Sequence, residues 1–230
     1  QSHTLFHQRF EPIAERLDQP PAVAAEHDLV IRNGTLYDGS GGPPVTGDIA
    51  IDGDTIARTV EQHLATRSSR RGKVEVAFYG GNFLGLPEEQ RHDLLTIATA
   101  HVARGDVASI RFSTRPDTIT ESRLAAIRDF PLHTIELGVQ SMDDRVLARA
   151  NRGHDALCTV TAARMVESAG YALGLQMMTG LPGDTPRRAI QPACKLVARA
   201  QDFVRIYPTL VLRQSRLAEA FRTGAFIPAS

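Results

Sequence analysis

The sequence predicts an α/β fold built on a parallel sheet. Between about residue 74 and residue 224, short apolar segments typical of strands alternate with segments whose apolar residues recur at helical spacing. Strands that alternate with helices in this way pair in parallel through right-handed crossovers. Glycine and polar residues follow several of these strands, and parallel α/β sheets bind ligands at those carboxyl ends. With 230 residues and 42% hydrophobic content, the chain is long enough to bury a sizeable core.

The composition excludes several classes of protein. Lys plus Arg and Asp plus Glu both number 26, so a zero net charge excludes a strongly basic, nucleic-acid-coating surface as a global property, though not a local basic patch. No apolar run approaches the roughly 20 residues that span a bilayer, and no signal peptide is expected. The two cysteines, Cys158 and Cys194, are too few for a disulfide framework. We therefore expect a reduced, cytoplasmic protein with no membrane contact, and we make no prediction of its oligomeric state.

The chain is expected to divide into three parts. Residues 1–27 are polar and are predicted to form a tail or linker. Residues 28–58 are predicted to form a small antiparallel β unit, which is too short to bury a core alone. Its tight turns are expected at Asn33–Gly34 and Asp52–Gly53, because such pairs adopt the positive φ angles that hairpin turns need. Residues 59–230 are predicted to form the α/β domain.

Strands and helices of that domain follow one another in the order that a parallel sheet requires. The expected strands are Val74–Tyr79, Ala108–Ser113, Thr134–Val139, Tyr171–Met178 and Phe203–Leu210. The expected helices are Leu86–Arg104, Glu121–Asp129, Asp143–Arg149, Leu157–Ala169, Arg187–Ala200 and Arg216–Arg222. Gly170 and Gly224 suit the left-handed position at which helices commonly end.

Candidate ligand-binding residues follow the first two strands. Gly80, Gly81 and Asn82 end the first strand, and a glycine pair lets a ligand approach the backbone because no Cβ intervenes. An ordinary tight turn is the alternative explanation. Ser113 and Arg115 end the second strand, where the planar fork of an arginine can bind a carboxylate or a phosphate. A turn that starts the next helix explains that segment equally well.

Further candidates follow the third and fourth strands. The amide of Gln140 offers a donor and an acceptor, which suits the two hydroxyls of a ribose. Arg152 follows a short helix after the third strand and can fold back over its end. His154 could act as an acid or a base, although a cap or surface position is the more usual role. Gln176 lies near the end of the fourth strand. Polar groups after four successive strands are typical of a site for a nucleotide-like ligand.

Five motifs carry a resemblance to a known family. They are FYGGNF, RFSTRPD, TIELGVQSMDDRVLARANRGH, LQMMTGLPGDT and FVRIYPTLVLR, and they occur in that order within about residues 59–230. This part of the chain resembles the radical S-adenosylmethionine (radical SAM) superfamily, in particular the elongator catalytic subunit and oxygen-independent coproporphyrinogen oxidases. The resemblance implies a partial (β/α)6 TIM-like barrel of the radical SAM type. We expect it to lack the first strand and the cluster loop and to follow the small antiparallel unit.

The resemblance also implies how S-adenosylmethionine would be held. Gly80, Gly81 and Asn82 match the glycine motif whose backbone receives the methionine amino group. Arg115 matches the arginine of the elongator-like TRPD motif. Gln140 matches a glutamine that binds the ribose, and Arg152 matches the arginine that pairs with the methionine carboxylate.

Two of the implied binding positions depart from the family pattern. Ser113 stands where relatives often carry an acidic residue near the methionine amino group. Gln176 stands where relatives often place an aspartate on the ribose.

The largest departure concerns the cluster. Family members hold a [4Fe–4S] cluster with three cysteines in a CxxxCxxC-type loop, and the cluster delivers the electron that yields a 5′-deoxyadenosyl radical. Thiolates serve because they are soft, anionic ligands for iron. The 230 residues contain only Cys158 and Cys194, in two different expected helices, so no cluster ligands and no metal site are predicted. We therefore expect radical catalysis to be impaired or absent in this chain.

Other readings remain open for the two ends of the chain. Residues 28–58 resemble the opening of an amidohydrolase of the N-acyl-D-amino-acid deacylase kind, without the His-x-His pair that binds metal in such enzymes. A non-catalytic fusion or a truncated fragment is one alternative, since elongator-like relatives continue beyond the last residues here. An RNA-binding module is another, supported by elongator analogy and by the basic residues Arg67, Arg70, Arg71 and Lys73. A solvated loop is the simpler explanation of that cluster.

Overall fold

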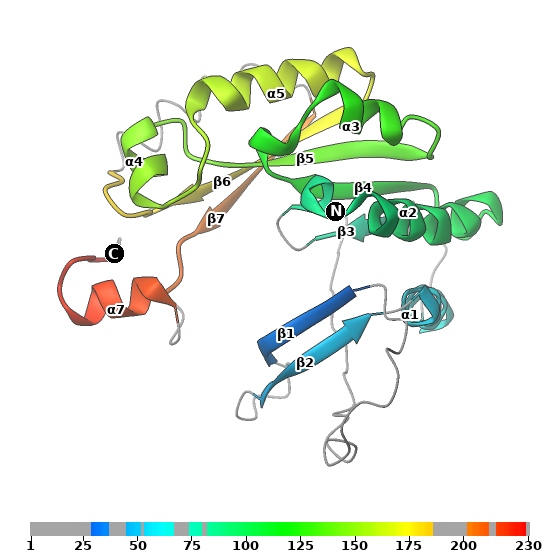
Figure 1. Ribbon diagram of the computed structural model, residues 1–230, viewed down its shortest axis with the longest axis horizontal. Coiled ribbons are helices and arrows are strands. Elements are labelled where there is room, and N and C mark those ends of the chain that lie inside the picture. Colours follow the sequence, from blue (N-terminus) through cyan, green and yellow to red (C-terminus); the bar gives the residue numbers. More distant parts are fainter. Residues whose placement is uncertain are drawn as a thin grey trace.

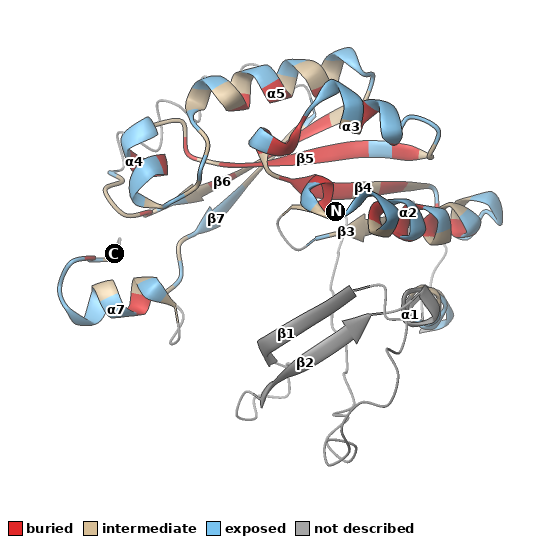
Figure 2. Ribbon diagram, in the orientation of Figure 1, coloured by how far each residue is buried: buried red, intermediate tan, exposed pale blue. Residues whose placement is uncertain are grey.

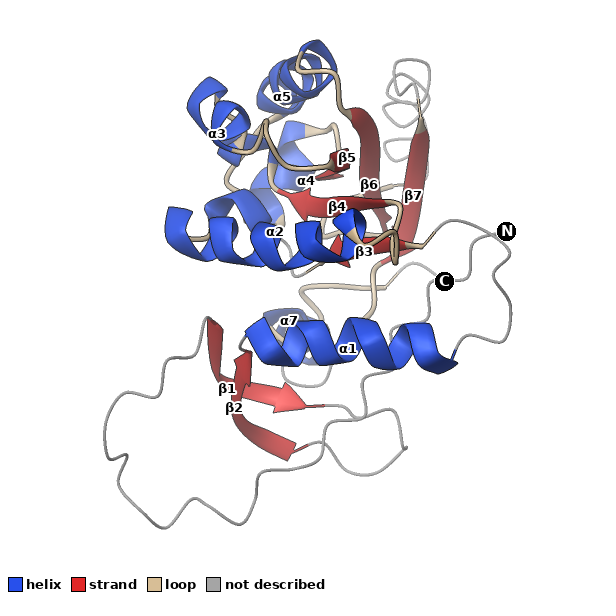
Figure 3. Cartoon of the chain, turned by 90° about the vertical axis from the view of Figure 1, so that its right-hand side faces the viewer, coloured by secondary structure: helices blue, strands red, loops and turns tan. Residues whose placement is uncertain are grey.

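A five-stranded parallel sheet forms the centre of the molecule. The computed structural model describes residues 29–36, 45–51, 53–66, 74–79, 82–185, 202–211 and 215–228. The strands are β3 (Glu75–Phe78), β4 (Ser109–Thr114), β5 (Leu132–Gln140), β6 (Ala172–Thr179) and β7 (Phe203–Pro208), paired in the order β3-β4-β5-β6-β7. All four pairings are parallel, and the sheet curls into a half-barrel (Figure 3). The predicted α/β fold and partial barrel are confirmed.

Helices connect the strands where the sequence predicts them. Those of the domain are α2 (Glu88–Ala103), α3 (Glu121–Ala126), α4 (Asp144–Arg149), α5 (Ala156–Ser168) and α7 (Arg216–Arg222). Side-chain caps fix several of their starts: the Asp155 carboxylate accepts the backbone N–H of Cys158 at 2.7 Å, and Thr120 accepts that of Arg123 at 3.2 Å. Gly170 and Gly224 adopt φ angles of 84° and 75° and end α5 and α7 as expected.

The hydrophobic core lies between the convex face of the sheet and its helices. Helices α2, α3 and α5 cover that face, and the buried parts of β4 and β5 lie beneath them (Figures 1 and 2). Ile110 and Phe112 from β4 pack there with Leu95 of α2 and Val166 of α5. Side chains alternate in direction along a strand, so Arg111 and Ser113, the neighbours of Ile110 and Phe112 in β4, point to the concave face. That face is polar. The fold therefore separates an apolar outer layer from a polar interior.

The N-terminal unit differs in detail from its prediction. Strands β1 (Leu29–Leu36) and β2 (Val45–Ile51) pair antiparallel, as expected, but the helix α1 (Gly53–Thr66) follows directly. Asn33–Gly34 is not a hairpin turn: it lies inside β1, where the register of the pairing shifts between Ile31 and Gly34. A local irregularity in a strand accommodates such a pair as readily as a turn does.

The turn predicted at Asp52–Gly53 is also wrong, because Gly53 begins α1. Ile56, Val60 and Leu64 recur every four residues and give this segment its helical spacing. The helix runs across position 58, at which the sequence divides the chain, and the division into residues 1–27, 28–58 and 59–230 stays a prediction. The expected tail and the expected helix Arg187–Ala200 lie outside the described residues. Within the described ranges, no helix is long and apolar enough to cross a membrane.

Candidate functional site

Gln140 ends β5 in an unusual backbone conformation. Its φ angle is 63°, a left-handed value that few residues other than glycine adopt, and the β5–β6 register shifts between Leu137 and Gln140. Such strain of about 1–3 kcal/mol is often found at functional sites. The conformation places Gln140 Nε2 next to Gly138, where a Cβ would lie only 3.2 Å from it. Gln140 Oε1 is buried and has no hydrogen-bond partner.

Arg152 and His154 return to the same strand end after α4. Arg152 Nη2 donates to the carbonyl of Gly138 at 3.4 Å, while its buried Nε has no partner. Burial and the nearby Arg115 guanidinium lower the pKa of Arg152. His154 Nε2 lies 3.2 Å from the carbonyl of Val139, and its buried Nδ1 has no partner. Gln140, Arg152 and His154 thus lie at the end of β5, and each has one buried polar atom without a hydrogen-bond partner.

We call Gln140, Arg152 and His154 the β5-end cluster. The expectation that Arg152 folds back over the third strand is confirmed by its contact with Gly138. Buried polar atoms rarely stay without a partner, because each costs about 1–3 kcal/mol. Three such atoms at one strand end are therefore a mark of a ligand-binding surface.

Asn82 and Arg115 meet at the carboxyl ends of β3 and β4. Asn82 Oδ1 accepts from Thr114 Oγ1 and Thr118 Oγ1, both at 2.9 Å, and from the backbone N–H of Arg115 at 3.3 Å. The side-chain oxygen of Asn82 is therefore committed to joining two loops. Arg115 forms a bidentate pair with Asp117, at 2.8 and 2.7 Å. The Asp117 carboxylate therefore already occupies Nε and Nη2 of the Arg115 guanidinium, so fewer of its N–H groups are free for a ligand than the sequence suggests.

Ser113 and Gln176 lie deeper, on the concave face of the sheet. Gln176 Nε2 donates to Glu136 Oε2 at 2.8 Å, so its amide belongs to a side-chain network rather than to the β5-end cluster. Ser113 is buried in β4 and stands opposite Glu136 in the β4–β5 register. Gly80 and Gly81 lie outside the described residues.

Glu136 is the centre of that network, and the sequence analysis did not select it. Its carboxylate, which is 0% exposed, accepts from the Tyr79 hydroxyl at 2.6 Å, from Arg205 Nε at 3.1 Å and from Arg111 Nη2. We call Tyr79, Arg111, Glu136, Gln176 and Arg205 the Glu136 network. The signal for it was a charged residue inside each of three apolar strand segments, because a charge in a buried strand needs a partner.

Phe203 and Gly174 shape the surroundings of the Glu136 network. The guanidinium carbons of Arg111 and Arg205 lie 5.0 and 5.2 Å from the centroid of the Phe203 ring. A Cβ at Gly174 would lie 2.5 Å from Phe203 Cζ and 2.8 Å from Glu136 Cγ. Only glycine lets the ring and the carboxylate approach the strand this closely. Burial and the hydrogen bond to Glu136 raise the pKa of Tyr79 to about 12.

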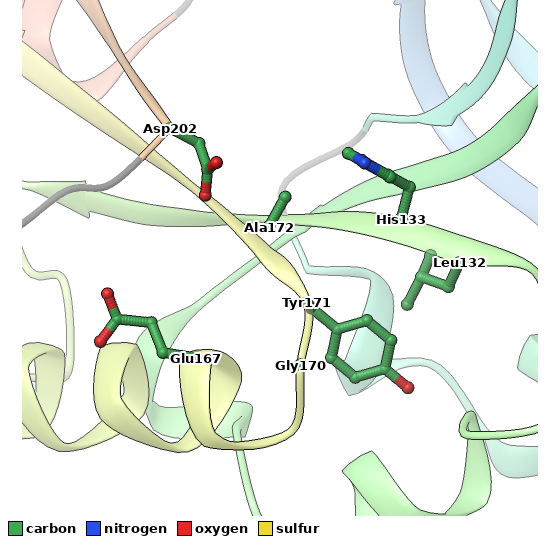
Figure 4. A pocket seen from close by; sticks show the side chains of 7 residues that line it. All are labelled: Leu132, His133, Glu167, Gly170, Tyr171, Ala172 and Asp202. Atoms are coloured by element: carbon green, nitrogen blue, oxygen red, sulfur yellow. The ribbon is translucent and has the colours of Figure 1, made fainter.

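A separate hollow opens at the other end of the sheet. It has a volume of about 420 Å³ and is lined by Leu132, His133, Glu167, Gly170, Tyr171, Ala172 and Asp202 (Figure 4). Leu132 and Ala172 are the first residues of β5 and β6, so the hollow lies at the amino ends of the strands. Parallel sheets bind substrates at the opposite end, where the β5-end cluster stands.

The cysteines do not form a metal centre in the part of the chain that the structure describes. Cys158 is half-buried in α5, and burial, together with Asp117 and Asp155, raises the pKa of its thiol. A raised pKa disfavours the thiolate that binds iron. Cys194 lies outside the described residues. Among the described side chains, no group of three His, Cys, Asp or Glu could hold a metal ion.

Comparison with known proteins gives the family. The sequence profile of the Radical SAM superfamily matches residues 52–191. Elongator complex protein 3 of Drosophila melanogaster is 32% identical over 67% of this chain and 32% of its own length, and that of Saccharomyces cerevisiae is 29% identical over 67% and 31%. The chain spans about a third of the length of these relatives.

Solved structures agree on the fold. An archaeal Elp3 from Methanocaldococcus infernus, with an N-terminal deletion, has a TM-score of 0.68 at 22% identity and covers 78% of this chain and 47% of that chain. Coproporphyrinogen III oxidase from Escherichia coli, described as a radical SAM enzyme, has a TM-score of 0.55 at 20% identity and covers 77% and 42%. The profile matches more than half of the chain, and the half-barrel agrees with it, so this chain belongs to the radical SAM superfamily.

Proposed function

We propose that the chain binds S-adenosylmethionine at the carboxyl ends of its parallel strands. The observation that supports this most is a pair of buried atoms without a hydrogen-bond partner, Gln140 Oε1 and Arg152 Nε, on two side chains that both reach Gly138. An amide oxygen accepts a hydrogen bond from a ribose hydroxyl, and a guanidinium donates to the methionine carboxylate. Gln140 Oε1 thus offers an acceptor for a ribose hydroxyl, and Arg152 Nε offers a charged donor for the methionine carboxylate. When bound, S-adenosylmethionine supplies a sulfonium centre that one electron can cleave.

Other residues hold the site in place. Asn82 fixes the end of β3 against the turn that carries Arg115, so we propose a positioning role for it. Arg115 keeps its pair with Asp117 and lies beside Gly153, where a Cβ would come within 2.7 Å of Arg115 Nη2. Gly80 and Gly81 are proposed, from the family resemblance, to receive the methionine amino group through their backbone. Ser113 and Gln176 would line the floor beneath the cofactor.

We also propose that these 230 residues do not hold a [4Fe–4S] cluster unaided, so that radical catalysis is impaired or absent in this chain. The sequence contains two cysteines, separated along the chain, whereas the family uses three in one loop. The raised thiol pKa of Cys158 supports the proposal. No step of radical chemistry is assigned to any residue here.

Cofactor binding can be tested with the full chain and one arginine variant. We expect isothermal titration to detect binding of S-adenosylmethionine to the wild type. Arg152→Met should weaken that binding by about tenfold or more, because it removes a charged hydrogen-bond donor. Arg128→Met, at an exposed arginine before β5, is the matched control and should leave the affinity unchanged. A wild type that does not bind, or equal losses in the two variants, would contradict the proposal.

The cluster proposal has its own measurement. Anaerobic incubation with iron and sulfide, followed by desalting, should leave the purified chain without stoichiometric iron and without a cluster EPR signal. A supplied electron donor should then yield no 5′-deoxyadenosine from S-adenosylmethionine. A stoichiometric cluster in this material would contradict the proposal and leave the cofactor site unaffected.

The alternative functions gain no support from the described residues. The basic residues 67–73, on which an RNA-binding module would depend, lie outside them. The deacylase-like resemblance of residues 28–58, the fusion or truncated-fragment alternative and the cytoplasmic location stay predictions from the sequence.

A further inference from the structure

His154 has a hydrogen-bonding arrangement that defines the role of each ring nitrogen. Its Nε2 lies 3.2 Å from the carbonyl oxygen of Val139, which can only accept a hydrogen bond. The proton of a neutral imidazole therefore sits on Nε2, and Nδ1 carries a lone pair. That Nδ1 is buried and has no partner. The ring thus presents a single unused acceptor within the β5-end cluster.

The groups around His154 favour its neutral form. Arg152 and Arg115 face it with positive charge, and Asp117 faces it with negative charge. Burial is the largest effect and, together with the two arginines, outweighs the carbonyl of Val139 and Asp117, so the pKa of His154 is lowered. At neutral pH the acceptor on Nδ1 is therefore available.

Gln140 Oε1 is a second unused acceptor at the same strand end. A ribose cis-diol offers two hydroxyl donors, one for each of these two acceptors at the end of β5. Gln176, at the position that the family resemblance links to the ribose, donates its amide N–H to Glu136 instead. That N–H is therefore committed to the Glu136 network.

We propose that His154 Nδ1 and Gln140 Oε1 together recognise the ribose cis-diol of the nucleoside, each accepting from one hydroxyl. The proposal rests on the nucleotide site proposed above and adds His154 to it as a specificity-determining residue. It makes the site selective for a ribonucleoside with both hydroxyls present. It also makes binding dependent on an unprotonated His154.

Competition between nucleosides tests the role of the hydroxyls. Adenosine, 2′-deoxyadenosine and 3′-deoxyadenosine would compete with labelled S-adenosylhomocysteine for the full chain. We expect each deoxy analogue to bind the wild type about tenfold more weakly than adenosine, because it leaves one buried acceptor unpaired. His154→Phe should abolish the discrimination at one hydroxyl and keep it at the other. Unchanged discrimination at both hydroxyls in this variant would overturn the proposal.

A pH series tests the role of protonation and does not depend on the phenylalanine variant folding. The wild-type affinity for S-adenosylhomocysteine should be constant above about pH 6.5, the ordinary pKa of histidine, and fall as acid protonates Nδ1. His154→Asn keeps an acceptor near the Nδ1 position and should remove this dependence. His133→Asn, at the amino end of β5, should retain it.

The outcomes separate this proposal from the one on which it rests. A wild type that binds with the same pH dependence as His154→Asn overturns the role of His154 and leaves the nucleotide site standing. A wild type that binds no S-adenosylhomocysteine overturns both.

Discussion

Tyr79 shows how a contact with one buried carboxylate changes the chemistry of a residue that is itself partly exposed. Its hydroxyl donates to the Glu136 carboxylate at 2.6 Å, and Arg205 Nη2 lies 3.4 Å from the same oxygen. Burial acts first and the carboxylate second, and together they raise the pKa of the phenol to about 12. Ionisation would place a second negative charge against Glu136, so the fold favours the neutral phenol.

The pKa of Tyr79 leads to a prediction about alkaline pH. Because the folded-state pKa lies above the unfolded value of about 10, the stabilisation is fully present below pH 10 and is lost as pH rises toward about 12. Absorbance at 295 nm should show one tyrosine that ionises near pH 12, and Tyr79→Phe should remove that step. A wild-type titration that is complete by pH 11 would contradict the prediction.

The β5-end cluster could be predicted from the sequence only in part. Gln140 and Arg152 were found because they match motif positions, and the structure places both next to Gly138. The unused nitrogen of His154 could not be foreseen, because it depends on which carbonyl its ring faces. The Glu136 network could not be assembled either, since its members come from the end of β3 and from strands β4 to β7, whose neighbours are set by the curl of the sheet.

At the scale of elements, the strands were predicted well because each is a short segment rich in apolar residues, and most are followed by glycine or polar residues. The same reasoning failed at the N-terminal unit. Asn33–Gly34 has the composition of a turn, but its position between two paired halves of β1 makes it an irregularity in a strand. Helix α1 was missed because Asp52–Gly53 was interpreted as a second turn, although apolar residues recur at helical spacing after it.

The Glu136 network ties β3, β4, β6 and β7 to β5, which makes it a test of how the sheet is held together. Glu136→Gln removes the charge that faces Arg111 and Arg205 and should lower the free energy of unfolding by about 3–5 kcal/mol. Urea denaturation followed by circular dichroism measures the change.

Glu75→Gln is the matched control for this substitution. Glu75 also pairs with Arg111, at 3.1 Å, but remains partly exposed to solvent. Glu75→Gln should lower the free energy of unfolding by no more than about 1 kcal/mol, because water reaches the partly exposed Glu75 carboxylate and screens its pair with Arg111. Equal losses in the two variants would show that burial does not set the strength of the network.

At the scale of the whole molecule, the two ends of the sheet are open in the described part of the chain. There β3 pairs only with β4, and β7 pairs only with β6. The β7 end carries exposed apolar side chains, with Ile206 at 59% and Leu210 at 69% exposure. Exposed, apolar edge strands are templates for association with another chain.

We therefore expect the purified chain to associate as its concentration rises. Ile206→Lys should raise the concentration needed by at least about tenfold, because it removes apolar surface from the edge and adds charge to it. Leu157→Lys, at a leucine on α5 that is 71% exposed, should have little effect. Sedimentation velocity distinguishes the two, and a wild type that stays monomeric throughout would contradict the expectation.

The saturated carboxylate of Glu136 has a consequence for protein engineering. Four different residues donate hydrogen bonds to its two oxygens, so the carboxylate has no free position at which to accept a hydrogen bond from a ligand. Gln140, Arg152 and His154, by contrast, can be exchanged without breaking any of those four bonds. Substitutions that aim to change the ligand of the proposed site can therefore be confined to the β5-end cluster, while the Glu136 network that joins the strands is kept unchanged.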